Sequence, residues 1–310
     1  APTAPPERVE TPMTISMRPP AVIAATAPAP SRLGRFLTAW PPGVILAIAW
    51  IVAMLFVAIF ADQLSPQGFT KMDLRARLAD PWGFGGTTAH LLGTDELGRD
   101  VLSRLLHSIR MSLLVAFLGT LLSAFIGISV GFLAAHFRGW IEEAMMALAD
   151  MQASLPFMII ALAVLAFFGN SLVLFIALMG LNNWERFARI SRGLAIAASE
   201  QGYAGAVRHL GGSPWRVYGL HILPNIAGTL LVSMTLSFPE IILLESGLSF
   251  LGLGVQPPLT SLGNMVGYGR EYMQSAPWIM LAPSVIIVLT TLAISILGDW
   301  LRDRLDPTLR

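Results

Sequence analysis

The sequence predicts an all-α, polytopic membrane protein with six transmembrane helices. Of its 310 residues, 55% are hydrophobic and only 13% are charged, and the mean hydropathy is +0.66. These values are typical of a membrane protein and not of a soluble globule. Apolar segments alternate with polar ones, and each apolar segment is long enough to cross a hydrocarbon core of about 30 Å.

The N-terminal forty residues differ from the rest of the chain. Residues 1–30 are rich in Pro and Ala and lack apolar periodicity, which predicts disorder, and 31–40 form a short amphipathic run. The first span is expected at 43–61. The divisions that we expect along the chain are 1–40, 41–110, 111–298 and 299–310.

Five further spans follow from long, predominantly apolar runs. The run after Asp150 is too long for one helix, and Gly169-Asn170-Ser171 interrupts it. Residues 246–270 carry no charge before Arg270, but Pro257-Pro258 and many glycines predict an irregular loop. The expected spans are 111–135, 144–168, 172–190, 222–245 and 278–298.

Composition excludes several classes of function. A net charge of +1 provides no basic field for nucleic acid, and the absence of cysteine excludes disulfides and thiolate chemistry. The only lysine, Lys71, is not part of a Gly-Lys-Ser/Thr sequence, so the chain has no phosphate-binding loop of its own. The histidines lack ligand spacing and no nucleophile motif occurs. We therefore expect no metal site, no catalytic residue and no enzyme activity.

A polar island at 199–225 separates the fourth and fifth spans and has the pattern of two short helices. Gly211 can end the first helix in a left-handed conformation, and Ser213 can cap a second helix that begins with Pro214. This shape suits docking into a partner's groove, and the alternative is a solvated connector. The distribution of arginines places the island and both termini in the cytoplasm. The first helix carries an apolar stripe formed by Tyr203, Ala206, Val207 and Leu210.

The island resembles the cytoplasmic loop of permease subunits of ATP-binding-cassette importers, whose pattern is Glu-Ala-Ala, three residues, Gly, and a later Leu-Pro. Gly205 stands where the family usually has Glu, and Val207 stands where it has the second Ala. The resemblance implies that residues 203–216 act as a coupling helix that docks on an ATPase. The matching residues are Ala206, Gly211, Leu223 and Pro224.

Three other stretches extend the resemblance to the C-type permease subunit of dipeptide and oligopeptide importers, a group that includes nickel and glutathione permeases. They are 92–105, 245–265 and 298–307. The implied fold is that of a type I importer permease in the bacterial inner membrane, forming half of the translocation pathway. The implied partners are a homologous second permease, two cytoplasmic ATP-binding subunits that hold ATP and Mg²⁺, a periplasmic or lipid-anchored substrate-binding protein, and membrane lipid.

The turn before the second span is rich in charge. Thr94 or Asp95 can cap the following helix, while Glu96 and Asp100 are placed to offset Arg99 and Arg104. We favour a structural role for this turn. The alternative is a periplasmic gate or a contact to the binding protein, made by Asp95, Arg99 and Asp100.

Glu240 and Glu245 lie in the fifth span, where carboxylates are costly and indicate function. Both are pathway candidates. Glu240 is the deeper of the two and either meets a peptide's amino terminus or pairs with a neighbouring subunit, whereas Glu245 is near enough to the outer end to reach water. A different class of protein, a proton-coupled secondary transporter, would use both residues as relays.

Two further patterns concern packing and the inner face. Small residues recur every four positions in the second span, which predicts close helix packing within the bundle or against a second permease. Arg189 and Arg192 are expected to anchor the inner face to anionic lipid. The row of small residues is Gly119, Ser123, Gly127 and Gly131.

Overall fold

The computed structural model describes residues 40–200, 211 and 213–305, and residues 41–310 form one compact unit. The described residues contain helices and two isolated bridges but no strand, so the all-α prediction is confirmed. Residues 1–39, on which the prediction of N-terminal disorder falls, lie outside the described part. The elements are α2 (Pro42–Ile59), α3 (Ala61–Leu64), η1 (Leu74–Ala76), α4 (Val101–Phe137), α5 (Gly139–Ser154), α6 (Phe157–Phe168), α7 (Leu172–Leu181), α8 (Trp184–Glu200), η2 (Arg216–Ile222), α10 (Leu223–Phe250), α11 (Leu262–Gly269), η3 (Arg270–Tyr272) and α12 (Trp278–Leu305).

Four of the six expected spans are continuous helices. They are α2, α4, η2 continued by α10, and α12, each long and apolar enough to cross a membrane. Helix α4 begins before the predicted 111 because Asp100 caps it, accepting the backbone N–H of Ser103 at 2.8 Å. At 37 residues it is about 55 Å long and exceeds the thickness of the hydrocarbon core.

The expected third and fourth spans are each broken in two, which corrects the prediction. Helices α5 and α6 meet at an angle of 85°. Pro156 lies at the bend, and a proline disfavours helical geometry in the residue before it, here the extended Leu155. Helices α7 and α8 separate at Asn182 and Asn183, and Asn183 has a positive φ of 64°.

The region 246–270 is only partly the irregular loop that was expected. Helix α10 continues to Phe250, and α11 forms inside the region because Ser261 caps it by accepting the N–H of Asn264 at 3.2 Å. The irregular part is therefore limited to 251–261. The Asn264 side chain donates to the carbonyl of Val255 and thereby ties this loop to α11.

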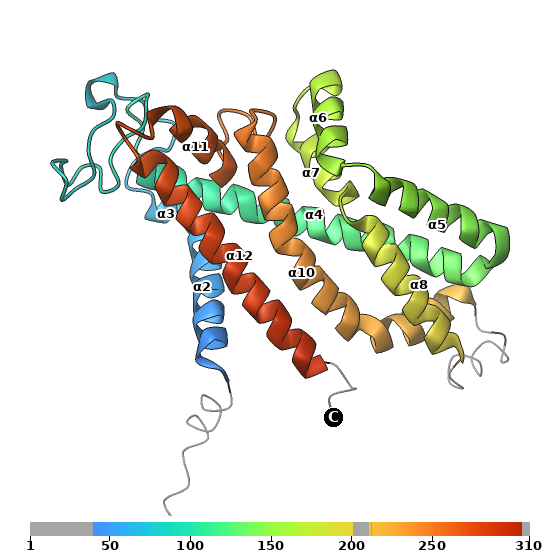
Figure 1. Cartoon of the computed structure of the whole chain (residues 1–310). Coiled ribbons are helices and arrows are strands. Elements are labelled where there is room, and N and C mark those ends of the chain that lie inside the picture. Colours follow the sequence, from blue (N-terminus) through green and yellow to red (C-terminus); the bar gives the residue numbers. More distant parts are fainter. Residues whose placement is uncertain (1–39, 201–210, 212, 306–310) are drawn as a thin grey trace, which may run out of the picture. The chain divides into compact units, whose positions relative to one another are not determined.

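Helix α4 is the element against which most others pack. In Figure 1 it passes behind α12 and α10 and continues to α5 and α8. A Cβ at Gly127 would collide with the carbonyl of Trp184, and one at Gly131 would collide with Ser191, so both glycines allow the α8 backbone to approach closely. The expected small-residue packing is confirmed within the bundle, where Gly127 and Gly131 pack against α8 and Gly119 packs against Met179 of α7.

We predict that Gly127→Ala lowers the free energy of unfolding by about 1–3 kcal/mol, because α8 must move away from the added methyl group. The measurement is the thermal unfolding midpoint of the protein in detergent. Gly193→Ala is the matched control, since Gly193 of α8 has open space around it and the change should raise helix stability by up to about 1 kcal/mol. Equal shifts for the two variants would contradict the packing argument.

Candidate functional site

The described residues of the polar island, 211 and 213–225, have the geometry that the sequence predicts. Gly211 has a φ of 77°, in the left-handed region that favours glycine. The hydroxyl of Ser213 accepts the backbone N–H of Arg216 at 3.4 Å, and its carbonyl accepts the N–H of Val217 at 3.0 Å. Pro214 is the first helical residue. Five of the proposed coupling residues lie outside the described part of the chain: Tyr203, Gly205, Ala206, Val207 and Leu210.

Helix α8, which leads into the island, and η2, which lies inside it, share one apolar core with α4. Ala195 and Ala198 of α8 pack with Val217 and Ile222, and with Ala135 of α4. The segment η2 between Ser213 and α10 is π-helical, a geometry that is frequent at functional sites. Because one core joins all three elements, a displacement of the island moves them together.

Tyr218 links η2 to the C-terminal half of α4. Its ring centroid lies 5.5 Å from that of Phe132 and 5.6 Å from that of His136. Trp215 and Leu220, by contrast, are exposed. The junction therefore has one face packed against the bundle and one apolar face that the described residues leave exposed.

The basic residues of α8 are held by acidic residues of other helices. Arg189 pairs with Asp150 of α5 at 3.1 Å, and Arg192 pairs with Glu142 of the same helix. The expectation that they anchor the inner face to anionic lipid stays a prediction, and both side chains are partly exposed. These pairs attach α5 to α8.

The two predicted pathway carboxylates have different surroundings. Glu240 of α10 is half exposed and contacts Arg186 and Asn183. Glu245 is fully buried, which corrects the expectation that it reaches water. It accepts hydrogen bonds from Ser112 at 3.1 Å and Ser249 at 2.7 Å, and the described residues offer it no cation.

The Glu245 cluster joins three elements. Ser112 of α4 also accepts the backbone N–H of Leu262 at 3.0 Å, and Ser249 accepts from Ser261 at 3.3 Å. The carboxyl group of Glu245 thus connects α4, α10 and the start of α11. The carboxyl group and these serines form a buried hydrogen-bond network inside the bundle.

The charged turn before α4 is largely buried. Asp95 accepts from Arg99 Nε and from Arg104 Nη1, both at 2.7 Å, while Glu96 accepts from Arg99 at 2.8 Å. Asp95 and not Asp100 therefore offsets Arg104, and Asp100 rather than Thr94 or Asp95 caps the helix, which corrects both sequence assignments. Asp95, Asp100 and Arg104 are each less than a tenth exposed.

Asp100 also contacts His90 at 3.0 Å, which closes the turn. Of the three proposed gate residues, Asp95 and Arg99 bond to each other, whereas Asp100 bonds to His90 and Ser103. Nearby on α3, hydrogen bonds from Arg110 and His107 lower the pKa of the exposed Asp62 carboxyl.

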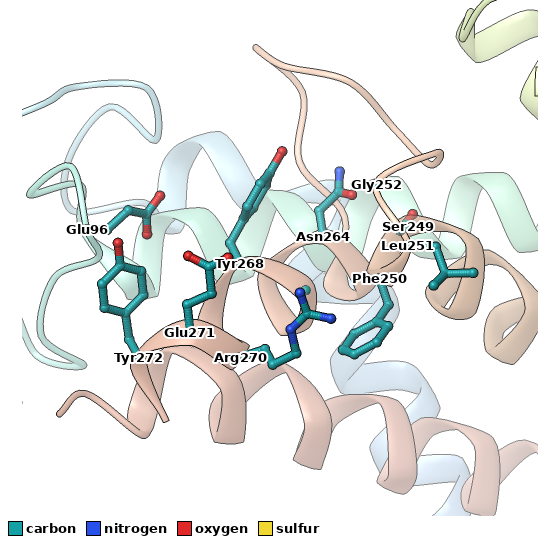
Figure 2. A pocket seen from close by; sticks show the side chains of 11 residues that line it. Glu96, Ser249, Phe250, Leu251, Gly252, Asn264, Tyr268, Arg270, Glu271 and Tyr272 are labelled. Carbon is teal, nitrogen blue, oxygen red and sulfur yellow. The ribbon is translucent and has the colours of Figure 1, made fainter. Parts of the chain in front are cut away.

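The same end of the bundle holds a small open cavity of about 270 Å³. Figure 2 shows Arg270 directed toward Phe250, with its guanidinium 5.1 Å from the ring centroid, and Glu96 on the side of Tyr272. Glu271, an exposed residue, also lines the cavity. Sequence reasoning missed Arg270 and Glu271 because Arg270 ends the segment 246–270, which was expected to be an irregular loop, and Glu271 follows it directly.

No group of three or more His, Asp or Glu side chains in the described part of the chain could hold a metal ion.

Comparisons with known proteins agree with the arrangement described above. A family model described as a binding-protein-dependent transport system inner membrane component matches residues 127–310. The di/tripeptide transport system permease protein DppC of Pseudomonas aeruginosa is 35% identical and covers 86% of this chain and 89% of its own length. The dipeptide transport system permease protein DppC of Escherichia coli K12 is 37% identical, with coverage of 86% and 90%.

A third relative is the glutathione transport system permease protein GsiD of Pectobacterium atrosepticum, which is 33% identical and covers 86% of this chain and 87% of its own length. Among solved structures, the MetNI methionine ABC transporter in an inward-facing conformation matches with a TM-score of 0.53 at 19% identity, covering 64% of this chain and 95% of its own. This likeness confirms the expected permease fold.

We predict that Asp95→Asn lowers the free energy of unfolding by about 3–5 kcal/mol, because Arg104 then keeps its charge in a buried position without a carboxylate. Glu96→Gln is the control and should cost less than about 1 kcal/mol, since Arg99 retains Asp95. Thermal unfolding midpoints in detergent compare the two. A larger loss for Glu96→Gln would contradict the assignment of Asp95 as the central anion.

Proposed function

Since this chain belongs to the family of binding-protein-dependent transport system inner membrane components, we propose that it is the permease subunit of an ATP-driven peptide importer. Two of its relatives are named for di- and tripeptide transport, and a third for glutathione, which is itself peptide-like. The alternative cargo is nickel, glutathione or another peptide-like solute. The chain itself is a transport component, and hydrolysis of ATP is the work of partner subunits.

The proposed setting is the bacterial inner membrane. Several apolar helices make the chain a multi-pass membrane protein, and the arginine distribution supports cytoplasmic N- and C-termini. In this setting the chain lines half of a pathway at its interface with a homologous second permease. Two ATPase subunits, holding ATP and Mg²⁺, lie beneath the pair, and a binding protein delivers peptide from outside.

The observation that carries the proposal is the single core formed by α4, α8 and η2 at the base of the polar island. Residues 203–216 would dock into a cleft on one ATPase. Closure of the ATPase pair then displaces the island, and the shared core transmits the movement to α8 and α10. This is alternating access by rocking of a packed bundle.

Uptake of a labelled dipeptide by vesicles that contain the purified complex tests this function. We predict that uptake requires ATP and persists without a proton gradient.

We also predict that Gly211→Val reduces uptake about tenfold or more, because a β-branched residue at a φ of 77° costs about 1–2 kcal/mol and disfavours the docked shape of the loop.

Gly169→Val is the matched control. Gly169 has a φ of 81° and open space like Gly211, but it lies at the turn between α6 and α7. Its uptake should stay within about twofold of the wild type. Uptake that follows the proton gradient and ignores ATP would favour a secondary transporter, and equal losses in both variants would contradict a special role for the 211 turn.

A further inference from the structure

A charged pair lies on one face of α8 and α10. Arg186 Nη1 contacts both carboxylate oxygens of Glu240, at 2.9 and 3.1 Å, and Asn183 Nδ2 donates to Glu240 at 2.6 Å. The Arg186 and Glu240 side chains are 44% and 43% exposed. The pair is therefore accessible from the face that α8 and α10 share.

The position of this pair along α10 is unusual for an exposed ion pair. Glu240 belongs to a helical run, 216–250, that is long and apolar enough to span a membrane. It lies about 15 Å from the C-terminal end of that run at 1.5 Å per residue. Ionised side chains at such depth face water-filled passages or protein and not lipid. The same must hold for this face of α10.

Hydroxyl groups continue the polar face toward the polar island. Ser233 lies two turns before Glu240, and Thr229 lies one further turn back. The Ser233 hydroxyl donates to the Thr229 carbonyl at 2.9 Å, so its own oxygen can still accept a hydrogen bond. The stripe thus offers acceptors suited to peptide N–H groups.

A cavity of about 450 Å³ lies beside this stripe, between α8, α10 and the end of α12. This volume is within the range of small-molecule sites. Arg186 and Arg302 line it together with Thr229 and Ser233, and the remaining lining is aliphatic. Among the residues that the structure describes, no carboxylate lines it, and Glu240 contacts Arg186 from outside the cavity. The cavity therefore favours a small anionic ligand with apolar side chains.

We propose that this cavity is a substrate site on the translocation pathway, in which Arg186 binds the terminal carboxylate of a short peptide. The planar guanidinium matches a carboxylate in two parallel hydrogen bonds. Glu240 neutralises Arg186 while the cavity is empty, and Thr229 and Ser233 accept from the peptide backbone. This inference rests on the proposed function as a peptide importer, and it assigns the Arg186 guanidinium as the group that binds the peptide's C-terminus.

Equilibrium binding of labelled Ala-Ala-Ala and its C-terminal amide to the purified permease–ATPase complex tests the site. The complex is nucleotide-free, lacks the binding protein and is held in phosphatidylcholine nanodiscs, so neither the binding protein's selectivity nor anionic lipid contributes. The wild type should bind the free acid at least about tenfold more tightly than the amide. Arg186→Gln should remove this preference.

Arg189→Gln is the matched control, because Arg189 lies one turn further along α8, is 42% exposed and also pairs with a carboxylate. It should keep the preference for the free acid. Three outcomes would each overturn the assignment. Both variants could lose the preference for the free acid, Arg186→Gln could keep it, or the wild type could show none.

A second arm adds phosphatidylglycerol to the nanodiscs. The preference for the free acid should persist there, and displacement of Ala-Ala-Ala by this lipid in the wild type but not in Arg186→Gln would assign the cavity to a lipid headgroup and overturn the proposal. ATP-dependent uptake is measured separately. If the wild type takes up dipeptide but shows no binding preference for the free acid, the proposed site is rejected and the proposed peptide-importer function is not.

Discussion

The close approach of α4 and α8 is the contact on which the rest of the structure depends. It exists because Gly127 and Gly131 have no Cβ where the α8 backbone passes. In a membrane, where lipid is as apolar as the side chains, such fitted surfaces hold helices together. Helix α8 in turn positions three arginines, each paired with a carboxylate of α5 or α10. The glycine contact therefore also fixes where the charges lie.

Buried ion pairs and hydrogen bonds at other points also hold α4 to its neighbours. Asp95 neutralises two arginines and holds the turn that leads into α4. Glu245 collects serine hydroxyls from α4 and α10, and these serines also bond to α11. Buried polar groups of this kind are costly unless satisfied, so they favour one arrangement of the helices over others. The bundle is therefore constrained at both ends of α4, by charge at one and by apolar packing beside the polar island at the other.

Much of this arrangement could be predicted from sequence. The length of an apolar run predicts where a helix spans the membrane, and the spacing of small residues predicts which face of it packs closely. The spans at α2, α4, α10 and α12 and the left-handed Gly211 follow from such local rules. Apolar run length does not predict the breaks at Pro156 and Asn183, because backbone preference ends the helix there while the surrounding sequence stays apolar. Charge partners such as Arg186 with Glu240 could not be predicted, since they join residues 54 positions apart.

The central claim is that α4, α8 and η2 move as one body with the polar island. Distances between spin labels in the assembled complex test it, and the absence of native cysteine allows specific labelling. Cysteines at Gly193 of α8 and Leu220 of η2 suit this purpose, because Gly193 has open space and Leu220 is exposed. The 193–220 distance should be the same with and without bound ATP, while the distance from 220 to a label on the second permease's loop changes. A 193–220 distance that changes with ATP would contradict the account.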